Sequence, residues 1–167
     1  MMMGPRPRKS ALTAHVTASV GWVGAVAGFL ALAIAGLTSR DPETVRAAYL
    51  AMELTAWFVI VPLAFASLIT GLIQSLGTTW GLFRHYWVVA KLGLTVFATI
   101  ILLVKMEPIS YLAGAVGSGT LVHGALRAVR VQLVVHAAGG MLVLLVATVL
   151  SVFKPWGVTP YGRPSQR

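Results

Sequence analysis

The stretch "ALTAHVTASVGWVGAVAGFLALAIAGL", residues 11–37, decides the fold. It holds 27 residues, and none of them is Asp, Glu, Lys or Arg. About 20 apolar residues are enough for an α-helix to cross the hydrocarbon core of a bilayer. A signal peptide is the alternative, because basic residues precede the stretch, but its apolar region is typically only about 7–15 residues long. We therefore predict a retained first transmembrane helix.

The composition of the whole chain agrees with this interpretation. The 167 residues are 57% hydrophobic and only 10% charged, and the mean hydropathy is +0.85. A soluble domain carries about 25% charged residues, so this chain could not cover a water-facing surface. The net charge of +9 comes from basic residues at helix ends and tails, where anionic lipid headgroups rather than nucleic acid account for them. We predict an integral membrane protein whose main partner is the lipid bilayer.

Three further apolar segments follow the first, at about 47–76, 86–104 and 131–153. Each reaches or approaches the roughly 20 residues that a membrane crossing needs. We therefore predict an all-α protein, a four-helix transmembrane bundle that forms one domain over residues 1–153. The proline-containing basic tail, residues 154–167, is predicted to be disordered.

The distribution of basic residues predicts the orientation in the membrane. The side of both chain ends carries the larger set: Arg6, Arg8, Lys9, Arg84, Lys154, Arg163 and Arg167. The opposite side carries the smaller set: Arg40, Arg46, Lys105, Arg127 and Arg130. Cytoplasmic loops are enriched in Lys and Arg, so both termini are predicted to be cytoplasmic. The abundance of Arg, Ala and Gly suits a GC-rich bacterial genome, and hence the bacterial inner membrane.

A first candidate site lies on the first helix. His15 and Trp22 are seven residues apart, which is about two helical turns, so both side chains share one face. We predict that this face points into the bundle, toward Lys91 on the third helix, which lies in the same leaflet. A neutral His15 there would keep a lone pair for a metal or a haem iron. The alternative is that His15 touches headgroup water and Lys91 reaches the surface alone. Glycines on the same helix should allow close approach of a neighbour: Gly21, Gly24 and Gly28.

A second candidate site lies in the opposite leaflet. Glu53 lies near the start of the second helix and His136 near the start of the fourth, and a carboxylate inside a membrane should point into the bundle. The two are predicted to meet as a carboxylate–imidazole pair, with either a functional role or a purely structural one. The small pair Gly139–Gly140 should favour close helix contact. His15 and His136 are expected more than about 15 Å apart along the membrane normal, which argues against one haem bridged by both.

Catalytic motifs are missing from the sequence. It has no G-x-S-x-G, no H-E-x-x-H and no Walker lysine, and it has no cysteine for thiolate chemistry. The absence of these motifs favours a protein that is not an enzyme, but it does not decide whether the protein catalyses a reaction. A metal site would rest on His, Glu and Lys alone.

Two stretches carry a resemblance to known membrane proteins. "HVTASVGWVG", residues 15–24, is similar to the opening of the four-helix proteins grouped around copper-resistance protein D and the membrane-type protoporphyrinogen oxidase. "TTWGLFRHYWVVAKLGLTVFATIILL", residues 78–103, resembles their junction between the second and third helices. The whole chain most closely resembles a family of actinobacterial integral membrane proteins of unknown function. The link to the characterised group rests on His15, Trp22, Gly24 and Lys91–Leu92.

The resemblance implies a haem, porphyrin or copper role carried on His15 and Lys91. The sequence departs from that pattern because it lacks a Met- or His-rich copper motif, and its third helix has no further His unless His85 serves. We expect a haem-like or metal cofactor, haem b or a metal ion, with His15, Lys91, Glu53 and His136 as the candidate binding residues. Two alternatives remain open: a non-catalytic subunit or scaffold, as a homo-oligomer or with a membrane partner, and a small ion or solute pathway through Glu53 and His136.

Overall fold

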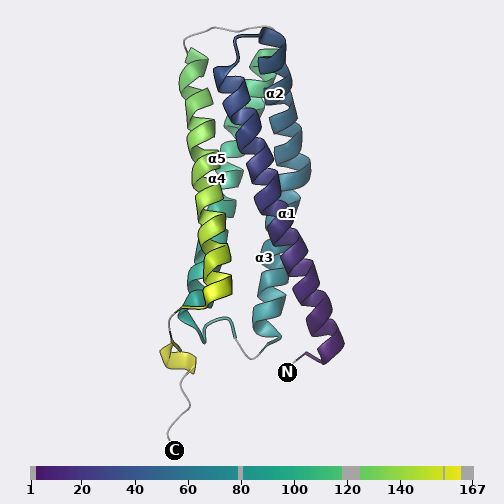
Figure 1. Cartoon of the computed structure of the whole chain (residues 1–167), viewed down its shortest axis with the longest axis vertical. Helices are drawn as coiled ribbons and strands as arrows, with labels where there is room; N and C mark the ends of the chain where they lie inside the picture. Colours follow the sequence, from purple (N-terminus) through teal and green to yellow (C-terminus); the bar gives the residue numbers. More distant parts are fainter. Residues whose placement is uncertain (1–2, 79–80, 118–124, 156, 163–167) are drawn as a thin grey trace, which may run out of the picture.

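The elements of the chain are long helices that run side by side (Figure 1). The structure is a computed structural model, and it describes residues 3–78, 81–117, 125–155 and 157–162. Its main helices are α1 (Pro5–Thr38), α2 (Pro42–Thr55), α3 (Val61–Leu76), α4 (Tyr86–Gly117) and α5 (Ala125–Phe153). The π-helical turn η1 (Ala56–Ile60) joins α2 to α3, so these elements form one continuous span, Pro42–Leu76. The result is four helices long and apolar enough to cross a membrane, which confirms the predicted all-α bundle.

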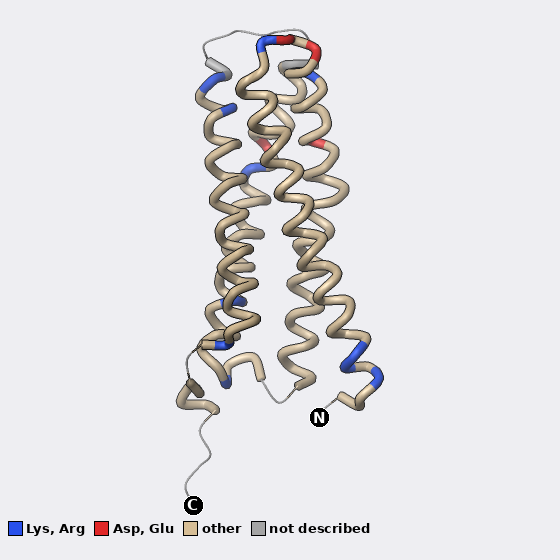
Figure 2. Tube along the Cα trace, in the orientation of Figure 1, with Lys and Arg blue, Asp and Glu red and all other residues tan. Residues whose placement is uncertain are grey.

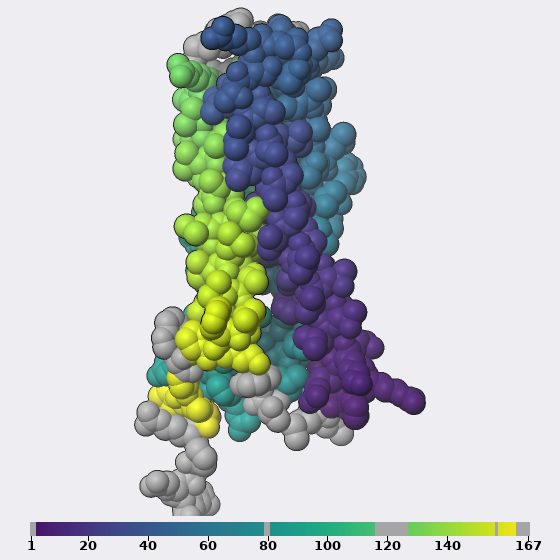
Figure 3. Space-filling model, viewed as in Figure 1, coloured from purple at the N-terminus to yellow at the C-terminus, as the bar shows by residue number. Residues whose placement is uncertain are grey.

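The helices form a closed ring. α1 packs on α2, α3 and α5, and α4 packs on the same three elements. α1 and α4 are therefore diagonal to each other, and so are α5 and the span formed by α2 and α3. We call the end where α1 begins and α5 ends the terminal end, and the opposite end the far end (Figure 1). In Figure 3, α1 and α5 lie together near the far end and diverge toward the terminal end.

The third span is longer than the sequence predicted. α4 runs to Gly117 rather than ending at residue 104, and it contains Pro108 in its interior. The "KMEP" sequence at residues 105–108 resembles a helix end because it is polar and has a proline, which removes a backbone hydrogen bond. Membrane helices tolerate such a proline when neighbouring groups satisfy the freed carbonyl. Lys105 therefore lies inside the third span instead of in a loop.

The second span begins earlier than predicted because it has a strong start signal. The carboxylate of Asp41 accepts from the backbone N–H groups of Glu43 and Thr44, at 3.3 and 3.0 Å, and Pro42 occupies the first helical position. The turn η1 ends two residues before Pro62. Pro62 has no N–H to donate to the carbonyl four residues earlier, so the regular α-helical ladder is interrupted there.

The last span and the tail also differ from the prediction. α5 begins at Ala125 instead of residue 131. Residues 157–162 of the predicted disordered tail are packed, because the backbone N–H of Thr159 donates to the carbonyl of Arg84 at 2.9 Å, and Val158 forms a β-bridge with His85. Residues 156 and 163–167 lie outside the described residues, as do His123 and Trp80.

The core forms from one stripe on each helix, and the stripe on α1 contains Trp22, which is 3% exposed. This confirms that Trp22 faces the bundle interior. Of the glycines predicted to allow close approach, Gly21 does so, because a methyl group added there would lie 3.4 Å from the side chain of Leu63 on α3. A methyl group added at Gly36 would lie 2.8 Å from the ring of Tyr49, whereas nothing lies within 4 Å of the same position at Gly24 or Gly28. The tight helix contact is therefore at the far end of α1.

Charged residues gather at the two ends of the bundle and leave its middle apolar (Figure 2). All four acidic residues of the chain, Asp41, Glu43, Glu53 and Glu107, lie in the far half. The described charges at the terminal end are all basic. Lys105 lies within α4, so the connections at the far end carry fewer basic residues than the sequence predicted.

Candidate functional site

The bundle contains a cavity in its interior, between its four spans. The cavity has a volume of about 350 Å³, and α1, η1, α4 and α5 supply its walls. Apolar side chains dominate the lining, including Trp22, Val26, Phe29, Ile60, Phe97 and Leu144. Gly139 and Gly140 also line it, and nothing lies within 4 Å of a methyl group added at either glycine. The predicted close helix contact at this pair is therefore wrong, because the missing side chains leave open space instead.

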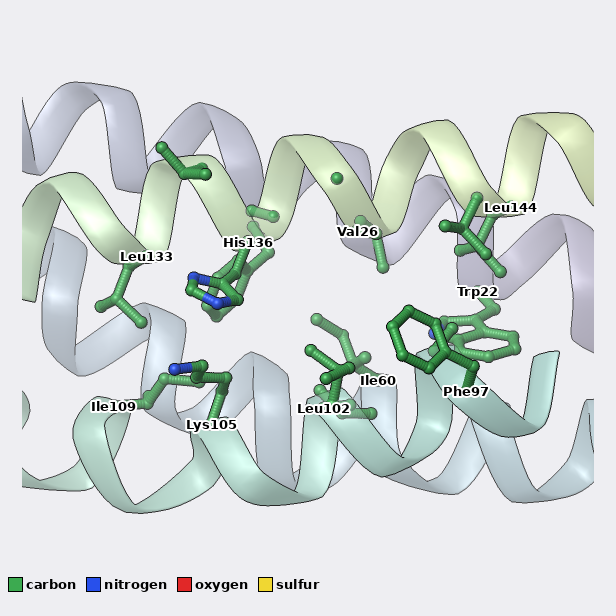
Figure 4. A pocket seen from close by; sticks show the side chains of 18 residues that line it. Trp22, Val26, Ile60, Phe97, Leu102, Lys105, Ile109, Leu133, His136 and Leu144 are labelled. Atoms are coloured by element: carbon green, nitrogen blue, oxygen red, sulfur yellow. The ribbon is translucent and has the colours of Figure 1, made fainter. Parts of the chain in front are cut away.

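Besides the indole of Trp22, two basic side chains bring nitrogen atoms into this otherwise apolar space. Lys105 from α4 and His136 from α5 both line the cavity, and they point toward one another across it (Figure 4). α4 could not place Lys105 there if it ended at residue 104. The cavity therefore has a polar part near the far end and an apolar part near Trp22 and Phe97.

The orientation of His136 follows from one hydrogen bond. Its Nδ1 lies 2.6 Å from the backbone carbonyl oxygen of Gln132, one turn earlier on α5. A carbonyl oxygen can only accept, so Nδ1 carries the proton and donates it. In the neutral ring this leaves the lone pair on Nε2. Histidines that bind metals characteristically donate their other ring N–H to a carbonyl or carboxylate, which fixes the ring and its tautomer.

The predicted pair of Glu53 and His136 is not formed. Nδ1 of His136 bonds within its own helix, and Glu53 does not line the cavity. Glu53 lies on α2, which is diagonal to α5 in the ring of helices. The prediction placed both residues in the same half of the bundle, but it could not fix which way each side chain points from its helix.

His15 makes interhelical contacts with α3. Its Nδ1 lies 3.1 Å from the carbonyl oxygen of Ser67 and 3.1 Å from the hydroxyl of Thr70. The hydroxyl of Ser19 lies 2.8 Å from that of Ser67, one turn along the same face. His15 therefore faces the bundle as predicted, but its hydrogen bonds go to the second span, not to the third.

Lys91 also has a specific partner. Its Nζ donates to the hydroxyl of Ser151 on α5 at 3.1 Å, and that hydroxyl donates in turn to the carbonyl of Ala147 at 3.0 Å. Lys91 lies near the start of α4 and His15 near the start of α1, so both are toward the terminal end, in agreement with their predicted common leaflet. Since each side chain is hydrogen-bonded to another helix, the pair forms a polar layer near the terminal end and lines no part of the cavity.

Within the described residues, no group of three or more His, Cys, Asp or Glu side chains could hold a metal ion. Sequence reasoning missed Lys105 as a site residue because the proline three residues later suggested a helix end. The signal that could have found it is helical spacing, because Leu102, Lys105 and Ile109 share one helix face that continues past the proline.

A comparison of the chain with family models, curated proteins and solved structures finds no match.

Proposed function

We propose that this polytopic membrane protein binds one haem-like cofactor in the bundle cavity, with His136 as the ligand to its metal. The observation that carries the proposal is the orientation of His136. Its Nδ1 proton is donated to Gln132, and its ring points into an apolar cavity of about 350 Å³. Of the residues that the sequence suggested for cofactor binding, His136 alone lines this cavity.

The residues present fit a haem-like group in four respects. The apolar lining suits a flat hydrophobic macrocycle, and His136 offers the ring nitrogen that proximal histidines use. Lys105 supplies a cation for one of the carboxylates of such a group. Gly139 and Gly140 leave room for the macrocycle beside α5. A bound haem would supply electron transfer, and the protein would supply its orientation and its shielding from water.

A bare metal ion is less well supported, because the cavity offers a single imidazole and no carboxylate. A structural subunit is the second candidate function. The specific observation in its favour is that His15 and Lys91 both serve helix packing, through Ser67 and Ser151. These polar residues would then hold the bundle together for assembly with a membrane partner.

We propose the bacterial inner membrane as the location, with the terminal end in the cytoplasm. The exclusively basic charges described at that end, and the acidic residues in the far half, support this orientation. Reporter fusions at Arg167 should be active for a cytoplasmic reporter and silent for a periplasmic one. The reverse pattern would exchange the two leaflets.

Filling the cavity tests the proposal. Purified protein reconstituted with haem should show a Soret band. Gly140→Val should reduce haem binding at least about tenfold, because the valine side chain enters the open space of the cavity. Gly93→Val is the matched control, since Gly93 also has nothing within 4 Å but does not line the cavity. Equal haem binding by both variants would contradict the proposed site.

A further inference from the structure

A second polar feature lies beyond the cavity, near the far end, where α1, α2 and α5 meet. Tyr49 on α2 is 1% exposed, and its ring lies against the backbone of Gly36 on α1. The hydroxyl oxygen of Tyr49 has no hydrogen-bond partner in the part of the chain that the structure describes. Buried tyrosine hydroxyls usually find a partner, so this one calls for an explanation.

Arg130 on α5 lies over the same ring. The central guanidinium carbon is 5.4 Å from the ring centroid of Tyr49, which is a cation–π contact. The Nε atom of Arg130 is buried, and it too lacks an acceptor among the described residues. Two hydrogen-bonding groups from different helices, one of them charged, are thus left unpaired in one place. The cation–π contact satisfies the face of the guanidinium but none of its N–H groups.

We infer that Arg130 and Tyr49 bind the oxyanion of a phosphate group. Such an anion accepts from both donors at once, and the planar guanidinium is the side chain best suited to it. Arg130 lies five residues after the start of α5, so the site is at the depth where lipid headgroups reach a membrane helix. A phospholipid headgroup and free phosphate share this chemistry. Neither residue lines the cavity, so the inference does not depend on the proposed cofactor.

The test uses the full chain, free of cofactor, purified in a maltoside detergent that contains no phosphate. Short-chain phosphatidylglycerol and, separately, inorganic phosphate are titrated while the melting temperature is followed, because a ligand that binds the folded state raises it. We expect the wild type to be stabilised by at least one of the two. Stabilisation by phosphatidylglycerol alone identifies a headgroup site, and stabilisation by both identifies a site that also takes free phosphate.

Variants separate this site from diffuse positive charge. Arg130→Gln should weaken the binding about tenfold or more, as expected for loss of a charged hydrogen bond. Arg127→Gln is the matched control, because it removes the same charge from an exposed position on the same helix. Tyr49→Phe keeps the ring and should weaken the binding too. The inference is overturned if neither ligand stabilises the wild type, or if both Arg variants lose binding equally. It is also overturned if Tyr49→Phe binds as tightly as the wild type, because the hydroxyl would then make no bond to the anion.

Discussion

Nδ1 of His15 lies 3.1 Å from the carbonyl oxygen of Ser67, so His15 joins α1 to α3. Because that carbonyl can only accept, the proton is on Nδ1. The bond lies near the terminal end, away from the cavity that holds His136. His15 therefore has a packing role that accounts for an imidazole on an apolar helix.

Replacing His15 should affect stability and leave haem binding intact. His15→Ala loses an interhelical hydrogen bond, which is worth about 0.5–1.5 kcal/mol in folded proteins and membrane bundles. Unfolding in mixed micelles measures the loss, and the Soret band measures haem binding. Thr17→Ala, at an exposed position on the same helix, should be close to neutral. Loss of the Soret band in His15→Ala would make His15 a ligand and contradict the packing role.

Two glycines on α1 should respond to the same substitution with opposite signs. Gly36→Ala places a methyl group 2.8 Å from the ring of Tyr49, so the helices must separate, at a cost of about 1–3 kcal/mol. Gly28→Ala meets open space and should stabilise the helix by about 0.5–1 kcal/mol. Unfolding free energies of the two variants check this directly. Equal effects would show that α1 and α2 are not in close contact at Gly36.

The bond from Lys91 to Ser151 predicts an asymmetry between its two partners. Ser151→Ala removes the acceptor and leaves a partly buried ammonium unsatisfied, which should cost about 1–3 kcal/mol. Lys91→Met removes the charge and keeps the apolar stem, so it should cost less than Ser151→Ala or even stabilise the protein. The melting temperatures of the two variants are compared in one detergent. A Ser151→Ala variant as stable as the wild type would indicate that Lys91 reaches the membrane surface instead.

Acid should weaken the start of α2 through Asp41. Hydrogen bonds from the Thr44 hydroxyl and from the N–H groups of Thr44 and Glu43 hold the pKa of Asp41 below its ordinary value. The carboxylate therefore stabilises the folded state above the unfolded pKa of about 3.9, and this contribution is lost as the pH falls through the lower folded pKa. Between about pH 5 and pH 2, the melting temperature of Asp41→Asn should fall less than that of the wild type. Parallel curves would show that the cap contributes nothing.

The apolar runs alone were enough to predict the bundle, because bilayer thickness fixes how long a membrane helix must be. The burial of Trp22 followed from helical periodicity in the same way. The site could not be predicted to the same degree. The packing of the helices decides which way Glu53 and His136 point and whether they meet, and no short-range pattern encodes that. Pro108 obscured the end of α4, and with it the place of Lys105 in the cavity.

The absorption spectrum of the haem-reconstituted His136→Ala variant tests the central claim most directly. His136 donates Nδ1–H to Gln132 and should present Nε2 to the cofactor. We expect a Soret band in the wild type, its loss or a clear shift in His136→Ala, and its recovery when free imidazole enters the vacated space. A wild type that binds no haem, or a variant with an unchanged spectrum, would contradict the assignment of the cavity as a haem site held by His136.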